Sequence, residues 1–75
     1  MLLLGKPGCH LCDDARAIVT GVLADFPAVT FDEKSILDDP QLLDAYAEEI
    51  PVVLIDGKVH TIWRVDPARL RKALG

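Results

Sequence analysis

The chain has 75 residues, a formal net charge of −4 at pH 7, 51% hydrophobic residues and 27% charged residues. This length allows one domain, residues 1–75, and the apolar content is too high for a disordered chain. The apolar runs fall far short of the roughly 18 residues that a membrane span needs, so no membrane association is expected. The acidic balance gives no electrostatic basis for binding a phosphate backbone, so nucleic acid is not an expected partner.

The first half of the chain predicts a strand, a helix and a second strand. Met1–Gly5 is apolar and precedes a Pro-Gly loop, which is typical of a short strand and the turn that ends it. A helix is expected to begin around Cys9 to Cys12 and to run to about Asp25, because apolar residues recur there at helical spacing. Alternating apolar residues predict a second strand over Ala28–Asp32.

The second half predicts a helix, a hairpin and a last helix. Asp39-Pro40 and Asp66-Pro67 each pair an N-cap carboxylate with a proline suited to the first helical position. Val52–Ile55 has the composition of a buried strand, and Asp56-Gly57 predicts a tight turn, so Val59–Trp63 returns antiparallel. The apolar face expected for the second helix comprises Leu43, Tyr46, Ala47 and Ile50. The order β-α-β-α-β-β-α predicts an α/β domain with a four-stranded mixed sheet and helices on both faces.

The chain has two cysteines, Cys9 and Cys12, at the expected start of the first helix. The free N–H groups and the positive dipole end of a helix stabilise a thiolate there. Cys9 at the mouth of the helix is the candidate nucleophile, and Cys12, one turn later and more sheltered, suits a resolving thiol. In a reducing compartment such a pair is more often catalytic or metal-binding than structural, and the cytoplasm is the expected location.

Neighbouring side chains are candidate contributors to this site. Lys6 can add positive charge or hold the carboxylate of a thiol ligand. An ordinary solvated lysine with no role in the site is an equally good interpretation. His10 can act as a local cation or proton donor near neutral pH, or merely tune the potential from solvent. His60 is expected to be a surface strand residue with no role.

Two other uses of the cysteine pair stay open. One C-x-x-C supplies half of a tetrahedral metal site, so a zinc ion or an iron–sulfur cluster would have to be shared between two chains, and no metal site is expected within one. In the other, the chain is a redox-inert adaptor that binds partners through its oppositely charged surfaces.

Three segments together resemble the glutaredoxin-like branch of the thioredoxin fold, in the order of that family. They are Lys6–Asp13, Glu49–Val53 and Ile55–Lys58, and the resemblance covers essentially the whole chain. It implies a thiol-disulfide oxidoreductase that reduces or exchanges protein disulfides or glutathione mixed disulfides. It further implies a monomer with no bound cofactor, for which glutathione can serve as co-substrate.

The resemblance also assigns roles to individual residues. Cys9 matches the attacking thiolate, Cys12 the resolving thiol and Pro51 a cis-proline. A cis bond there turns the backbone of Ile50 toward Cys9, where a peptide or glutathione backbone can pair with it. Lys6 falls where glutaredoxins often carry a lysine that meets the glutathione carboxylate.

The sequence departs from the family where glutaredoxins hold the γ-glutamyl end of glutathione. The family usually has a Gly-Gly pair and a polar or acidic residue at that place, and this chain has His60–Arg64. Trp63 is expected to pack in the core or on the hairpin, with replacement of the missing contacts by Trp63 or Arg64 as the alternative.

Overall fold

The computed structural model describes all residues 1–75, in the element order that the sequence predicts. The strands are β1 (Leu2–Gly5), β2 (Asp32–Ser35), β3 (Val52–Ile55) and β4 (Lys58–Ile62). The helices are α1 (His10–Leu23), α2 (Pro40–Tyr46) and α3 (Pro67–Leu74), with a 3-10 turn, η1 (Ile36–Asp38), ahead of α2. None of the helices has the length and apolar character needed to cross a bilayer.

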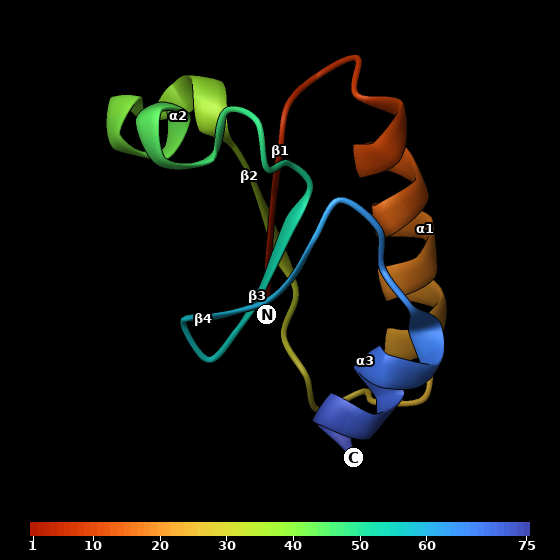
Figure 1. The fold of residues 1–75 in the computed structure, drawn as a ribbon. Coiled ribbons are helices and arrows are strands. Elements are labelled where there is room, and N and C mark those ends of the chain that lie inside the picture. The colour runs from red at the N-terminus through yellow and green to blue at the C-terminus, as the bar shows by residue number, and fades with distance from the viewer.

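The sheet is mixed and has the strand order β2-β1-β3-β4 (Figure 1). β1 pairs parallel with β2 and antiparallel with β3, and β4 is antiparallel to β3. The turn between β3 and β4 is Asp56-Gly57, with φ values of 52° and 80°. Left-handed conformation at both positions is typical of the tight hairpin turn, so this prediction is confirmed.

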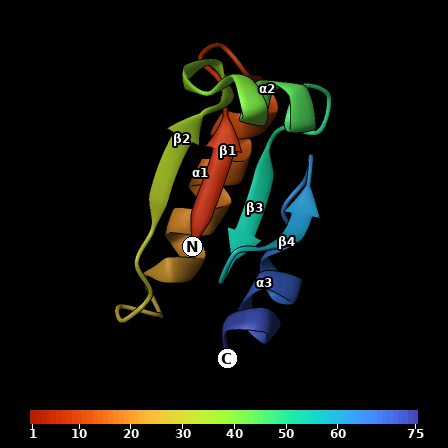
Figure 2. The same ribbon diagram turned by 90° about the vertical axis from the view of Figure 1, so that its left-hand side faces the viewer.

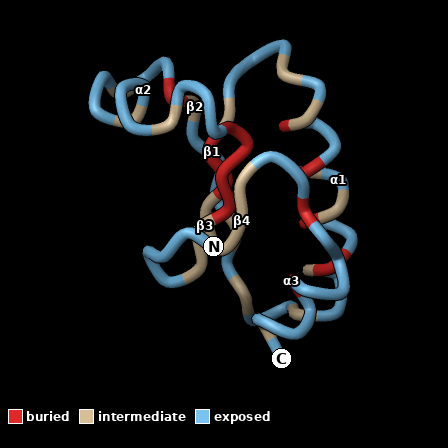
Figure 3. The backbone as a smooth tube through the Cα atoms, viewed as in Figure 1, coloured by how far each residue is buried: buried red, intermediate tan, exposed pale blue.

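Helices lie on both faces of the sheet, as Figures 1 and 2 show. α1 and α3 cover one face, and a buried cluster there joins Leu3 and Val53 to Val19 and Leu70. α2 lies toward the opposite face, over a second cluster that includes Leu4 and Ile36. The buried stretches of β1 and β3 run through the centre of the molecule in Figure 3.

Side-chain capping fixes where α2 and α3 begin. Asp39 accepts a hydrogen bond from the N–H of Gln41 at 2.9 Å, and Asp66 accepts one from the N–H of Ala68 at the same distance. Each capping aspartate precedes a proline in the first turn. Both helix starts that the Asp-Pro pairs predict are therefore confirmed.

The second strand lies later than predicted, at Asp32–Ser35 instead of Ala28–Asp32. The apolar residues of the predicted strand belong to the connection, where Val29 donates a hydrogen bond to the carbonyl of Phe26 and Phe31 packs against the first cluster. β2 is an edge strand whose one partner is β1, so its side chains remain largely exposed and can be polar. Hydrophobic alternation was therefore a misleading signal for this strand.

The prediction of which residues form the apolar face of α2 is also wrong in part. Leu42 and Tyr46, one helical turn apart, pack on the second cluster, whereas Leu43 is 39% exposed and Ala47 is exposed. The helix ends at Tyr46, so the buried Ile50 belongs to the following loop and does not define the helix face.

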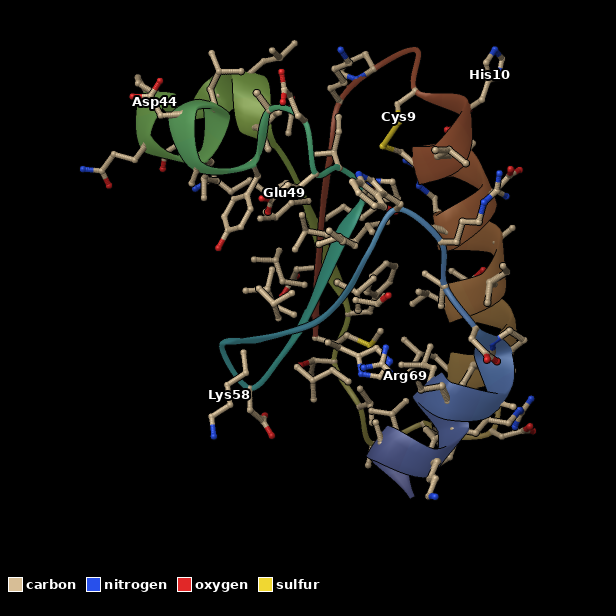
Figure 4. The ribbon with its side chains drawn as sticks, viewed as in Figure 1. Cys9, His10, Asp44, Glu49, Lys58 and Arg69 are labelled. Carbon is tan, nitrogen blue, oxygen red and sulfur yellow. A yellow bond between two sulfur atoms is a disulfide. The ribbon has the colours of Figure 1, made fainter.

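His60 is not the plain surface residue that the sequence suggested. The β3–β4 pairing shifts by one residue between Val53 and Leu54, which leaves His60 as the extra residue of a bulge. Its Nε2 atom is buried without a hydrogen-bond partner. Burial, and then the positive charge of Arg69 on α3 (Figure 4), lower the pKa of His60 below its ordinary value of 6.5.

This lowered pKa predicts that acidification destabilises the fold through His60. As the pH falls below 6.5, the unfolded chain takes up a proton that the folded chain resists until its lower pKa is reached. The free energy of unfolding is therefore expected to decline across that window, and His60 contributes no pH dependence above it. Urea denaturation at about pH 7.5 and about pH 5.5 measures this change.

The matched variants are His60→Phe, which removes the titrating group, and His10→Gln, which removes the exposed histidine. The decline is expected to shrink in His60→Phe and to persist in His10→Gln. An unchanged decline in His60→Phe would contradict the assignment.

Candidate dithiol site

The two cysteines lie at the N-terminus of α1 and form a disulfide, with their Cα atoms 5.2 Å apart (Figure 4). Cys9 is the N-cap residue of α1, and its Sγ accepts a hydrogen bond from the N–H of Cys12 at 3.2 Å. Cys9 is half-buried, whereas Cys12 is only 1% exposed. A reduced Cys9 thus has a helix N–H and the helix dipole to stabilise a thiolate, and Cys12 is the sheltered partner.

Gly5, at the end of β1, has no side chain and so leaves room for the sulfur of Cys12. A β-carbon built on Gly5 would stand 2.9 Å from Cys12 Sγ and 3.2 Å from Cys12 Cβ. Real β-carbons are not found at the shorter distance, so any larger residue must displace Cys12 or the strand. The sequence carried no sign of this requirement, because it arises only when β1 and α1 pack together.

The Ile50–Pro51 segment packs beside the cysteines. The peptide bond between the two residues is cis. Pro51 is fully buried, and Ile50 shares the second cluster with Cys12, against which Cys9 also packs. Residues far apart in the sequence, at the start of α1 and ahead of β3, are therefore brought together here.

Lys6 and His10 take different places relative to the disulfide. Lys6 and Cys12 line a common cavity of about 230 Å³ that opens between α1 and β2. His10 is exposed and points outward, away from the sulfur of Cys9 (Figure 4). The fold thus brings Lys6 to the neighbourhood of Cys12 and leaves His10 in solvent.

An ion-pair network, which sequence reasoning missed, links this end of α1 to β2. Arg16 binds Glu33 at 2.5 Å and Asp13 at 2.9 Å. The hydrogen bonds that Arg16 donates to Glu33 and then to Asp13 raise the pKa of its guanidinium above its ordinary value. Pairing with Arg16 offsets the negative charge that Asp13 places near the candidate thiolate.

Trp63 is held beside the cis-proline segment and does not pack in the core. Its backbone N–H donates to the carbonyl of Pro51 at 2.8 Å, and its indole Nε1 donates to the carbonyl of Glu48 at 3.0 Å. The side chain is 52% exposed, and its φ of 66° lies in the region that favours glycine. The prediction that Trp63 packs in the core is therefore wrong, whereas its backbone hydrogen bond to Pro51 attaches it to the end of the β3–β4 hairpin, the other position expected for it.

No group of three or more histidine, cysteine, aspartate or glutamate side chains lies together as a metal-binding cluster. The candidate site is therefore the cysteine pair, which packs against the Ile50–Pro51 segment ahead of β3. A dithiol at the start of the first helix of a mixed sheet is the arrangement of a thioredoxin-like domain.

The solved structures agree with this fold class. The X-ray structure of the structural genomics target protein XcR50 from X. campestris is similar to this chain, with a TM-score of 0.72 and 33% sequence identity. The match covers 97% of this chain and 92% of that chain.

The particular family follows from the sequence comparison. The model described as "Glutaredoxin-like domain (DUF836)" matches residues 1–75, so the chain belongs to this glutaredoxin-like family. The uncharacterized protein Rv0508 of Mycobacterium tuberculosis is 30% identical over an alignment of 73 residues, and the match covers 92% of this chain and 75% of that protein. The glutaredoxin-like protein YDR286C homolog of Dictyostelium discoideum is 34% identical over an alignment of 70 residues, and the match covers 87% of this chain and 65% of that protein. The resemblance drawn from the sequence is thereby confirmed.

Proposed function

We propose that this chain is a thiol-disulfide oxidoreductase in which Cys9 is the nucleophile and Cys12 the resolving thiol. The observation that carries the proposal is the pairing of a half-buried Cys9 at the N-cap of α1 with a buried Cys12 one turn later. A thiolate is stabilised at the first position and sheltered at the second, as an attacking and a resolving thiol require.

In the proposed reaction the Cys9 thiolate attacks a substrate disulfide, forms a mixed disulfide and releases one substrate thiol. The Cys12 thiolate then attacks the Cys9 sulfur, forms the Cys9–Cys12 disulfide and releases the second thiol. The protein dithiol loses two electrons and two protons, and the substrate disulfide gains them. Two equivalents of a low-molecular-weight thiol such as glutathione return the protein to the dithiol.

Substrates of this reaction are disulfide-containing proteins and glutathione mixed disulfides. We propose that the backbone of Ile50, ahead of the buried Pro51, pairs with the substrate backbone, and that Lys6 meets a substrate carboxylate. The reaction needs no bound cofactor and one chain, and it suits a reducing compartment such as the cytoplasm.

Alkylation near pH 6 tests the activated thiolate. A thiol of ordinary pKa, about 8.5, is almost fully protonated there, so its reaction is slow. In the reduced Cys12→Ser variant, Cys9 is expected to react with iodoacetamide at least about tenfold faster than the cysteine of an unfolded peptide of the same local sequence. The Cys9→Ser variant, which leaves Cys12, is the matched control and is expected to react more slowly because Cys12 is buried. A rate for Cys9 no higher than that of the peptide would show that the nucleophile is not activated.

A further inference from the structure

A groove of about 380 Å³ runs along α1, between this helix and the connection from β4 to α3. Leu11, which stands between the two cysteines, forms one end of its lining, and Trp63 and Val65 come from the facing connection. Figure 1 shows this connection passing along α1. Six of the eight lining residues are apolar, and the two charged ones are Asp14 and Arg64. The groove therefore offers an apolar surface that reaches the first turn of α1, the turn to which Cys9 and Cys12 belong.

Trp63 holds its place in the wall of this groove against two unfavourable features. A left-handed backbone, here with φ of 66°, is rarely adopted by a bulky residue, and an indole that is 52% exposed leaves apolar surface in water. Two hydrogen bonds, to Pro51 and Glu48, fix the residue to the segment opposite the cysteines. Strained, exposed and firmly held residues are characteristic of binding sites.

We infer that this groove receives an apolar side chain of a polypeptide substrate next to the cysteine that is joined to Cys9, and that Trp63 determines this specificity. The inference rests on the proposed function, because the mixed disulfide at Cys9 is what places the substrate beside Leu11. Glutathione is a small, charged tripeptide with no apolar side chain to fill an apolar groove, whereas a polypeptide can supply one. The site therefore prefers protein disulfides that have a leucine or similar residue beside the cysteine.

An exchange equilibrium tests this preference. The Cys12→Ser variant is first glutathionylated at Cys9 and then incubated with a reduced peptide that has one cysteine. The peptide thiol attacks the mixed disulfide of Cys9 and glutathione, which forms a mixed disulfide of Cys9 and the peptide and releases glutathione as a thiol. Mass spectrometry of the two mixed disulfides gives the equilibrium constant. Two peptides are compared, identical except for leucine or serine next to the cysteine. Burial of the leucine side chain is expected to favour the leucine peptide by about tenfold.

Three further measurements link the preference to Trp63. The substitution Trp63→Gly, which the left-handed backbone favours, is expected to reduce the preference to about twofold or less. Val59→Ser removes an apolar residue of similar exposure outside the groove and is expected to leave the preference intact. Trp63 is the single tryptophan of the chain, so its emission reports on the groove alone and is expected to shift to shorter wavelength with the leucine peptide only.

The outcomes separate the two proposals. Equal constants for both peptides in the Cys12→Ser protein, with unchanged Trp63 emission, would overturn the inference and leave the proposed function standing. A preference that survives Trp63→Gly would overturn the assignment of specificity to Trp63. A Cys9 that accepts neither glutathione nor either peptide would overturn the proposed function and the inference with it.

Discussion

Replacement of Cys9 by serine is expected to lower the rate of turnover of a glutathionylated peptide in a glutathione buffer by at least about a thousandfold. A serine hydroxyl stays protonated near neutral pH and cannot form the mixed disulfide. Cys9 is the accessible sulfur at the helix N-terminus, whereas Cys12 is 1% exposed, so Cys12 cannot take over the attack. The measurement is the steady-state rate of release of the peptide thiol.

The matched variant, Cys12→Ser, is expected to retain activity on the glutathione mixed disulfide. Glutathione itself can release the Cys9–glutathione mixed disulfide, so the second cysteine is dispensable there. Reduction of a protein disulfide is expected to need both cysteines, because Cys12 completes the release of the second thiol. Equal activity in Cys9→Ser and the unmodified protein would refute the assigned roles. Absence of turnover in every form, together with bound zinc or iron in the purified protein, would favour a metal site shared between two chains.

Substitution of Gly5 by alanine is expected to lower the free energy of unfolding by about 1–3 kcal/mol, the usual effect of overpacking a filled site. The added methyl group would stand 2.9 Å from Cys12 Sγ, and both atoms are held by regular elements, β1 and α1. Gly5 has no left-handed backbone, so alanine meets no conformational strain, and the contact with Cys12 is the whole cause. The free energy of unfolding of a domain of this size is about 4–11 kcal/mol in total, so the loss is a substantial share of it.

Gly21→Ala is the matched control, because a β-carbon on Gly21 meets no atom within 4 Å. Gly21 lies inside α1, where alanine is expected to stabilise the protein by up to about 1 kcal/mol. Urea denaturation of the oxidised and the reduced proteins compares the two variants, and Gly5→Ala is also expected to slow closure of the disulfide by Cys12. A Gly5→Ala protein as stable as Gly21→Ala would contradict the close packing of Gly5 on Cys12.

Local sequence was informative where a local interaction decides the structure. The Asp-Pro pairs predicted the starts of α2 and α3 because the capping carboxylate and the proline act within one helical turn. Asp56-Gly57 predicted the hairpin because both residues accept a left-handed backbone. The cysteine pair could be located at a helix N-terminus for the same reason, since the Pro-Gly loop and the helical periodicity are adjacent in the chain.

Sequence reasoning was wrong where tertiary contacts override the local pattern. The alternation of Val29 and Phe31 indicated a strand, but the strand forms over Asp32–Ser35, where the chain pairs with β1. Leu43 was expected to face the core, and Leu42 does so instead, because the position of the second cluster determines which side of α2 is covered.

The element order, the hairpin, two helix caps and the position of the cysteine pair could be predicted from the sequence, because each depends on residues that are neighbours in the chain. Three features follow only from the tertiary structure: the contact of Gly5 with Cys12, the burial of the Nε2 atom of His60, and the attachment of Trp63 to the Glu48–Pro51 segment. These features join residues from different elements, and their distances depend on how the helices and strands pack. Packing is a property of the whole chain, so no local pattern of residues encodes it.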